Sequence, residues 1–352
     1  MNICYILSLA PHAGKTTTVL GLGEYLKQKK VPFTYRRPLG GRPVEVKGHI
    51  TDADALFVSE TLGLEIPPEE LTGVVLSQEL VIEALKGEKK GLLEKVVSLL
   101  QKAGKEGQMI LLHGYGGFYA GNFLGLSASR LLVEIPCRVL LVMRYEGLES
   151  LDLLLKVCED LRGNQAALLI NALAPELSAE YQEFVKPFIQ KKGIKVLGEI
   201  PYDKVLAGVS VKELTEVLQA RVLFSFEGDP LVEEFFIGGM QVDQAIKYFR
   251  RSRNFGVIVG GDRSDIQLAA LETGARCLLL TGGLYPNEII LSRAEEAGVP
   301  VLVVEGDTYT VARKVERYSS QAPLRHPLKV KRAQDLFRQH LPEELLCEFL
   351  GI

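Results

Sequence analysis

The sequence contains no apolar run near the ~18 residues that a membrane-spanning helix needs. No basic segment precedes the first apolar run at residues 3–7, as a secretory signal would require. The five cysteines are scattered and no two form a Cys-x-x-Cys pair, so they fit reduced thiols rather than a disulfide framework or a zinc site. We therefore expect a cytoplasmic location and no membrane partner.

An excess of charge of one sign is also missing. Lys and Arg number 41 against 44 Asp and Glu, and the net charge of −3 gives no general attraction to nucleic acid. A basic stretch at residues 325–332 is short and lacks the interleaved aromatic side chains on which bases stack. We expect a solvated segment there and no nucleic-acid partner.

The composition is typical of a packed globular protein, with 47% hydrophobic and 24% charged residues. At about 150 residues per domain, a chain of 352 residues is expected to form two domains. We place them at residues 1–210 and 211–320, followed by a helical tail at residues 321–352. The final helix of this tail is expected to dock on a domain or on a partner chain.

Short apolar runs alternate with helical patterns in both domains. The runs lack polar alternation, which is typical of parallel strands buried on both faces. Strands that alternate with helices predict an α/β fold, here a parallel sheet with helices on both faces followed by a smaller α/β domain. The first domain has predicted strands at residues 3–7, 33–35, 109–112, 139–143 and 167–170 and helices at 14–29 and 80–101. The second has strands at 222–226, 257–259, 277–280 and 301–304 and helices at 241–250 and 265–273.

Gly14-Lys15-Thr16 lies between the first predicted strand and the first helix, as in a phosphate-binding loop (P-loop). The backbone N–H groups of such a loop and the N-terminus of its helix cradle phosphates. Lys15 would then reach the β- and γ-phosphates, and the Thr16 hydroxyl would ligate Mg²⁺. Leu9 stands where the full motif has glycine, so the match is partial. The alternative is a plain helix start with a surface lysine.

Further short motifs follow in a specific order. They are Tyr35-Arg36-Arg37-Pro38-Leu39, Thr51-Asp52-Ala53-Asp54-Ala55, His113-Gly114-Tyr115-Gly116-Gly117, Ile170-Asn171 and Ile200-Pro201-Tyr202-Asp203. With this order and spacing, residues 1–210 resemble the dethiobiotin synthetase-like P-loop domain. That domain also occurs in cobyrinic acid a,c-diamide synthases and at the front of long phosphotransacetylases. The resemblance implies a P-loop NTPase-type sheet that binds ATP, or a related nucleotide, and Mg²⁺.

The resemblance also implies roles for single residues. In that family ATP phosphorylates a carboxylate, and Lys15 and Arg37 would be the catalytic residues here, with Arg37 standing where the family has lysine. Mg²⁺ would be held by Thr16 and Asp54, with Asp52 as the alternative to Asp54. The nucleotide contacts would come from Ala13, Gly14, Lys15, Thr16, Thr17, Gly116, Gly117 and Asn171.

Three positions leave alternatives open. His113 stands where the family has a glutamate that ligates the metal, and a neutral imidazole is a poor substitute for a hard oxygen ligand. It would be a general base, a phosphate contact or a residue that only caps the strand end. Asn171 either reads the adenine ring or simply ends a strand and starts a turn. His12, inside the loop, is expected to point to solvent.

Three glycine-bearing loops follow strands of the second domain. On the basis of these loops, residues 211–320 resemble the DRTGG domain. That domain accompanies other domains and is regarded as regulatory. The loops are Gly260-Gly261-Asp262-Arg263-Ser264, Thr281-Gly282-Gly283 and Glu305-Gly306-Asp307-Thr308. The C-terminal ends of strands are the edge at which α/β sheets bind ligands. We expect an unknown ligand or a subunit interface at Gly261, Asp262, Arg263, Gly282, Gly283, Asp307 and Thr308. The alternative is that the glycines serve turns and that Asp262 and Arg263 form a structural ion pair.

Together the two resemblances match the front of long phosphotransacetylases. Their acetyltransferase domain does not follow before Ile352, so no acetyl transfer is expected of this chain alone. The favoured function is a nucleotide-binding regulatory or sensor protein. The alternatives are an ATP-dependent carboxylate ligase or weak ATPase, and a P-loop relic that serves as an assembly scaffold. Related P-loop enzymes build their sites near subunit interfaces, so a homodimer or another homo-oligomer is expected.

Overall fold

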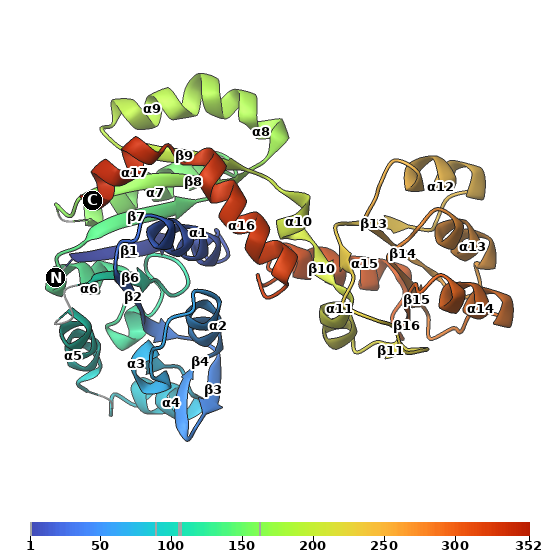
Figure 1. Ribbon diagram of the computed structural model, residues 1–352, viewed down its shortest axis with the longest axis horizontal. Helices are drawn as coiled ribbons and strands as arrows, with labels where there is room; N and C mark the ends of the chain where they lie inside the picture. Colours follow the sequence, from blue (N-terminus) through green and yellow to red (C-terminus); the bar gives the residue numbers. More distant parts are fainter. Residues whose placement is uncertain (1, 89, 105–107, 162) are drawn as a thin grey trace. The chain divides into compact units, whose positions relative to one another are not determined.

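The computed structural model describes residues 2–88, 90–104, 108–161 and 163–352. The chain forms two compact units (Figure 1). The first unit contains residues 1–202 together with residues 330–352, and the second contains residues 203–329. The end of the chain therefore belongs to the first unit and not to a separate tail.

The first unit is built on a seven-stranded sheet with the order β5-β2-β6-β1-β7-β8-β9. Every pairing in it is parallel, which confirms the predicted parallel α/β sheet. The carboxyl ends of these strands therefore lie along one edge. The strands are β1 (Asn2–Ser8), β2 (Phe33–Gly40), β5 (Thr72–Val75), β6 (Met109–His113), β7 (Arg138–Met143), β8 (Ala166–Leu173) and β9 (Lys195–Pro201).

Helices cover both faces of this sheet. On one face, alternate residues of β1 such as Tyr5 and Leu7 share a core with Val96 and Leu154, which lie on α5 and α7. The opposite face of β1 and β6 is covered by α1. The helices are α1 (Lys15–Gln28), α2 (Ala53–Thr61), α3 (Pro68–Leu71), α4 (Gln78–Leu85), α5 (Leu92–Gly104), α6 (Ala128–Glu134), α7 (Leu148–Asp160), α8 (Pro175–Glu180) and α9 (Lys186–Lys191). Shorter elements are the hairpin β3 (Pro43–Val46) and β4 (His49–Asp52), and the single turns η1 (Asn122–Leu124) and η2 (Tyr181–Val185).

One helix prediction in this unit is wrong. Residues 80–101 were expected to form a single helix, but α4 ends at Leu85 and α5 begins at Leu92. Gly87 and Gly91 have φ angles of +74° and +76°, in the left-handed region that ends a helix. The apolar periodicity on either side of the break hid it in the sequence.

The second unit contains a five-stranded sheet with the order β11-β16-β15-β14-β13, in which only β11 runs antiparallel to its neighbour. Its strands are β11 (Arg221–Val222), β13 (Glu234–Ile237), β14 (Phe255–Gly260), β15 (Cys277–Thr281) and β16 (Val301–Val303), and β10 (Val209–Ser210) pairs with β12 (Leu231–Val232). Its helices are α10 (Lys204–Ala207), α11 (Val211–Leu218), α12 (Val242–Phe249), α13 (Ser264–Glu272), α14 (Glu288–Glu296) and α15 (Thr308–Ser319). The strand predicted at 222–226 is wrong beyond its first residue, because after Leu223 bonds to Val301 the chain bends and leaves the sheet edge.

The last two helices, α16 (Pro327–His340) and α17 (Glu343–Leu350), carry the chain back to the first unit. Phe337 is buried against α1, where a Cβ added to Gly21 would lie 2.4 Å from the Phe337 ring. On β9, a Cβ on Gly198 would lie 2.5 Å from the carbonyl oxygen of His340. Of the two expected docking places, a domain or a partner chain, the structure shows the domain.

In the part of the chain that the structure describes, none of the helices combines the length and the apolar character that crossing a bilayer demands.

The seating of Phe337 on Gly21 leads to a stability prediction. Phe337→Ala opens a cavity against α1, so we expect the free energy of unfolding of the first unit to fall by about 3 kcal/mol. Leu328 lies on the same helix and is 57% exposed, so the control Leu328→Ala should change it by no more than about 0.5 kcal/mol. Urea denaturation followed by circular dichroism measures both. Equal effects of the two substitutions would contradict the docking of α16.

Candidate functional site

The loop between β1 and α1 is shaped by one glycine. Gly14 has a φ angle of +106°, and a Cβ there would lie 2.0 Å from Nδ2 of Asn171. It precedes α1 as the N-cap and offers no side chain to the first N–H groups of this 14-residue helix. A helix N-terminus without a side-chain cap presents N–H donors and a partial positive charge to an anion. The predicted loop residues Ala13, Gly14, Lys15 and Thr16 are therefore brought to this helix start.

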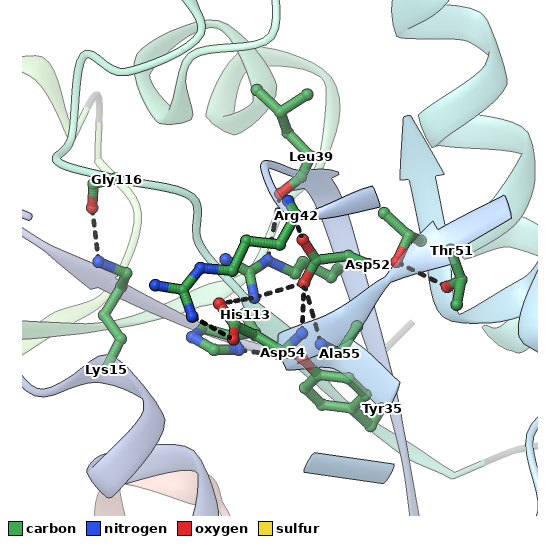
Figure 2. A network of polar contacts seen from close by, with 12 residues as sticks. Lys15, Tyr35, Leu39, Arg42, Thr51, Asp52, Asp54, Ala55, His113 and Gly116 are labelled. Atoms are coloured by element: carbon green, nitrogen blue, oxygen red, sulfur yellow. Dashed lines mark hydrogen bonds and ion pairs between the residues drawn. The ribbon is translucent and has the colours of Figure 1, made fainter. Parts of the chain in front are cut away.

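Lys15 is a buried lysine, 8% exposed, and not a surface residue as the alternative required. Its Nζ donates to Oγ of Ser8 at 2.7 Å. It also donates to the carbonyl oxygen of Gly116 at 2.5 Å (Figure 2). Burial, and then the nearby charge of Arg37, lower the pKa of Lys15 to about 7. An ammonium group held only by neutral oxygens gains from a negatively charged partner.

The turn after β6 packs directly on this loop. Gly116 adopts a φ angle of +54°, and a Cβ on Gly117 would lie 2.7 Å from the carbonyl oxygen of Leu9. The structure thus brings Gly116 and Gly117 together with Lys15, as the resemblance implied. Leu9 is buried, so the residue that stands in place of the motif's first glycine is a core residue. Thr17 is buried as well, whereas Thr16 is half-buried at the start of α1.

Asn171 on β8 also contacts the loop. Its Nδ2 donates to the carbonyl oxygen of Ala13 at 2.9 Å. Its Oδ1 is buried and has no hydrogen-bond partner among the residues that the structure describes. In this conformation Asn171 stabilises the loop, and its contact with an adenine ring stays a prediction.

Asp52 is fully buried and organises the neighbouring polar network (Figure 2). One oxygen accepts from Nη1 of Arg37 at 2.9 Å and the other from the backbone N–H of Arg42 at 2.9 Å. Oδ1 also caps α2 by accepting from the N–H groups of Asp54 and Ala55 at 3.1 and 3.0 Å. Sequence reasoning considered Asp52 only as an alternative metal ligand and missed this role, although an Asp two residues before a helical Asp-Ala pair is an N-cap signal.

The carboxylates of this network are engaged by arginine. Asp54 lies 3.6 Å from Nη1 of Arg37 and 3.4 Å from Nη1 of Arg42. Mg²⁺ is usually held by one or two carboxylates together with the phosphates of its nucleotide. Asp52 is fully buried and both of its oxygens already accept hydrogen bonds, whereas Asp54 would have to exchange arginine for the metal. Among the described residues, no group of three or more His, Cys, Asp or Glu is placed to hold a metal ion. The donor set therefore fits Mg²⁺ poorly.

His113 ends β6 in register with Ile6 of β1, and it is almost completely buried. Its Nδ1 lies 2.9 Å from the hydroxyl of Tyr35. Burial, followed by the charges of Arg37 and Lys15, lowers the pKa of His113 well below its usual value. The imidazole is therefore neutral at physiological pH. His12, in contrast, is exposed, as expected, and has a φ angle of +58°.

The second unit gathers its three glycine loops at one edge, because β14, β15 and β16 are parallel. The N–H of Gly282 donates to the carbonyl oxygen of Gly306 at 2.9 Å. The Thr281 and Thr308 hydroxyl oxygens lie 2.7 Å apart. Gly282 and Gly283 have φ angles of +80° and +65°, so both serve turns. At Gly261 in the first loop, an added Cβ would lie 2.2 Å from the carbonyl oxygen of Leu284, which also leaves room only for glycine.

The charged residues of these loops have local partners. Arg263 pairs with Asp265, with Nε and Nη2 at 2.9 and 3.0 Å from its two oxygens. The ion pair of Arg263 is thus with Asp265 and not, as suggested, with Asp262. Asp307 caps α15 by accepting from the N–H of Thr310 at 3.0 Å, and these hydrogen bonds lower its pKa. A role of the seven predicted residues in ligand binding stays a prediction.

A strand, a lysine-bearing loop and a helix within a parallel sheet define a P-loop α/β protein. The chain belongs to the family described as AAA domain, which it matches over residues 3–210. Residues 213–318 match the family described as DRTGG domain. Both matches agree with the resemblances inferred from the motifs.

Individual relatives are distant. A phosphate acetyltransferase of Synechocystis sp. is 24% identical over 366 residues, covering 98% of this chain and 51% of that protein. The chain thus spans about half the length of this relative and resembles its N-terminal region. The uncharacterized protein YtoI of Bacillus subtilis is 31% identical over 106 residues, or 30% of this chain and 23% of that protein. The MinD cell division protein of Aquifex aeolicus aligns with 58% of this chain and 84% of its own at 15% identity and a TM-score of 0.36.

The contrast between the two aspartates is testable. Asp52→Asn leaves the buried guanidinium of Arg37 without its main charge partner, so we expect a loss of about 3 kcal/mol in the free energy of unfolding. Asp54→Asn is the matched control, because Asp54 is partly exposed and its arginine contacts are long. We expect it to cost less than about 1 kcal/mol. Denaturant titration distinguishes them, and equal losses would show that Asp52 does not organise the network.

The lowered pKa of Lys15 predicts proton uptake. About one pH unit above pKa 7, Lys15 is largely neutral in the free protein and becomes charged when an anionic phosphate binds it. Binding should therefore consume nearly one proton, seen as a calorimetric enthalpy that varies with the ionisation enthalpy of the buffer. The exposed Lys27 offers the control Lys27→Gln, which should keep the effect. A binding enthalpy independent of the buffer would contradict the assigned state of Lys15.

Proposed function

We propose that this chain is a nucleotide-binding regulatory or sensor protein, whose first unit binds ATP or a related nucleotide on the P-loop. The observation that carries the proposal is the buried Lys15 beside the uncapped start of α1. Its hydrogen-bond partners among the described residues are two neutral oxygens, of Ser8 and Gly116. A desolvated cation at a helix N-terminus favours a phosphate ligand over water.

The proposed function of the first unit is nucleotide binding rather than catalysis of phosphoryl transfer. Phosphoryl transfer depends on positioning and on neutralisation of charge by a metal ion. Asp52 is saturated by hydrogen bonds, and ligation by Asp54 would break its pairs with Arg37 and Arg42. Mg²⁺ at Thr16 and Asp54 stays a prediction. An ATP-dependent carboxylate ligase, with Lys15 and Arg37 as catalytic residues, is the alternative enzyme.

For the second unit we propose a ligand or a subunit contact at the edge formed by its three loops. The supporting observation is that exposed tyrosines flank these loops, with Tyr285 53% and Tyr309 69% exposed. Arg221 stacks on Tyr285 and Arg313 on Tyr309, with centroid distances of 5.7 and 5.9 Å. Stacked tyrosine and arginine side chains are common at binding surfaces. A homodimer or another homo-oligomer remains part of the proposal.

Calorimetric titration with ATP tests the function of the first unit. Wild type should bind, and Lys15→Ala should bind at least ~tenfold more weakly, because it loses a charge-assisted hydrogen bond to phosphate. Lys27→Ala, an exposed lysine at the far end of the same helix, should bind as wild type does. Absence of binding by wild type would overturn the proposal and favour the scaffold alternative. Turnover of ATP that depends on an added carboxylate would favour the ligase.

A further inference from the structure

Tyr35 determines which ring nitrogen of His113 carries the proton. A buried hydroxyl needs an acceptor for its hydrogen. Tyr35 is fully buried, and among the described residues Nδ1 of His113 is the acceptor that its hydroxyl reaches. The hydroxyl therefore directs its own hydrogen to Nδ1 of His113, 2.9 Å away. A neutral imidazole that accepts at Nδ1 carries its proton on Nε2. His113 thus offers an N–H donor, and no lone pair, on the side away from Tyr35.

This donor lies in the P-loop site. His113 precedes the turn whose Gly116 carbonyl holds Lys15, and it pairs with Ile6, two residues before the end of β1. Both Lys15 and Arg37 are close enough to act on its ring electrostatically. Its Nε2 has no hydrogen-bond partner in the described part of the chain. The position that faces the loop is therefore occupied by a donor without a partner.

A metal ion cannot use such a group. Ligation by histidine needs the lone pair of a ring nitrogen, and Nδ1 is bonded to Tyr35 while Nε2 carries the proton. The carboxylates are equally unsuited, because Asp52 and Asp54 are bound to Arg37. The hydroxyl of Thr16 is then the remaining predicted ligand, and it lacks the carboxylate that usually accompanies phosphates around Mg²⁺.

An anion, in contrast, finds donors and positive charge. Lys15, Arg37 and Arg42 carry three positive charges in this network when Lys15 is protonated, against two negative charges on Asp52 and Asp54. The N-terminus of α1 adds about half a charge more. The net charge of the site is therefore positive, as the binding of a polyphosphate requires, without a contribution from a divalent cation.

We propose that the site binds its nucleotide as the metal-free polyphosphate anion. In this arrangement Nε2–H of His113 donates to a terminal phosphate oxygen, at the place where a metal-bound nucleotide would present its cation. The inference rests on the proposed nucleotide binding and deepens it. It makes His113 a ligand-contacting residue and Tyr35 the residue that sets its tautomer. A site of this kind holds a nucleotide without the metal on which rapid phosphoryl transfer depends.

The experiment measures the dissociation constant for ATP twice by calorimetry, with Mg²⁺ and with excess EDTA. For wild type we expect tighter binding in EDTA than with Mg²⁺, because Mg²⁺ complexes ATP and lowers the concentration of the free anion. His113→Leu removes the donor and should weaken binding in EDTA by ~tenfold or more, whereas His113→Gln keeps an N–H donor and should retain most of it. His49→Gln, at an exposed histidine of β4, should leave both values unchanged.

A variant that makes ATP binding depend on Mg²⁺ gives the most direct test. His113→Glu places a carboxylate beside the phosphates, so its binding should fail in EDTA and return with Mg²⁺. Thermal unfolding shows whether each variant is folded. If His113→Glu does not fold, His113→Leu and His113→Gln still test the inference. Wild-type binding that needs Mg²⁺, or a leucine variant that binds as wild type in EDTA, would overturn this inference alone. Absence of wild-type binding in both conditions would overturn the proposed function itself.

Discussion

The buried ion pair between Asp52 and Arg37 determines the rest of the candidate site. Both oxygens of Asp52 are occupied, by Arg37, by the backbone of Arg42 and by the start of α2. A carboxylate with this many donors is fixed in position, and it fixes the guanidinium beside β2. Arg37 is then close enough to act electrostatically on Tyr35, Lys15 and His113. The carboxylate of Asp52 therefore fixes the position of the positive charge that acts on these three side chains.

The helix that carries Lys15 is held along its length. Gly14 fits against Asn171 before its start, Gly21 accommodates Phe337 at its middle, and Tyr25 contacts Sγ of Cys347 at 3.1 Å near its end. The last two of these contacts come from residues 330–352, which follow the second unit in the chain. A helix fixed in this way presents its first N–H groups in one orientation, which is the preorganisation that an anion site requires. Residues 330–352 are thereby part of the unit that carries the P-loop.

Much of the fold could be predicted, because it depends on local patterns. Uninterrupted apolar runs such as 139–143 are typical of strands buried on both faces, and β7 lies there. The break at Gly87 and the early end of β11 were missed, because apolar residues continue past both points. The motif identified Lys15 and the two glycines after His113. The saturation of Asp52, the pairing of Arg263 with Asp265 and the tautomer of His113 depend on neighbours distant in sequence or on side-chain orientation, which no spacing encodes.

The central claim is that Lys15 and His113 together form an anion site on the P-loop. A crystal structure with a non-hydrolysable ATP analogue, grown with Mg²⁺ present, tests it most directly. We expect Nζ of Lys15 to leave the Gly116 carbonyl for a phosphate oxygen. Nε2 of His113 should lie within hydrogen-bond distance of a terminal phosphate oxygen, and Asp54 should remain paired with arginine. A metal ion ligated by Asp54, or an analogue bound away from the loop while Lys15 stays on Gly116, would contradict it.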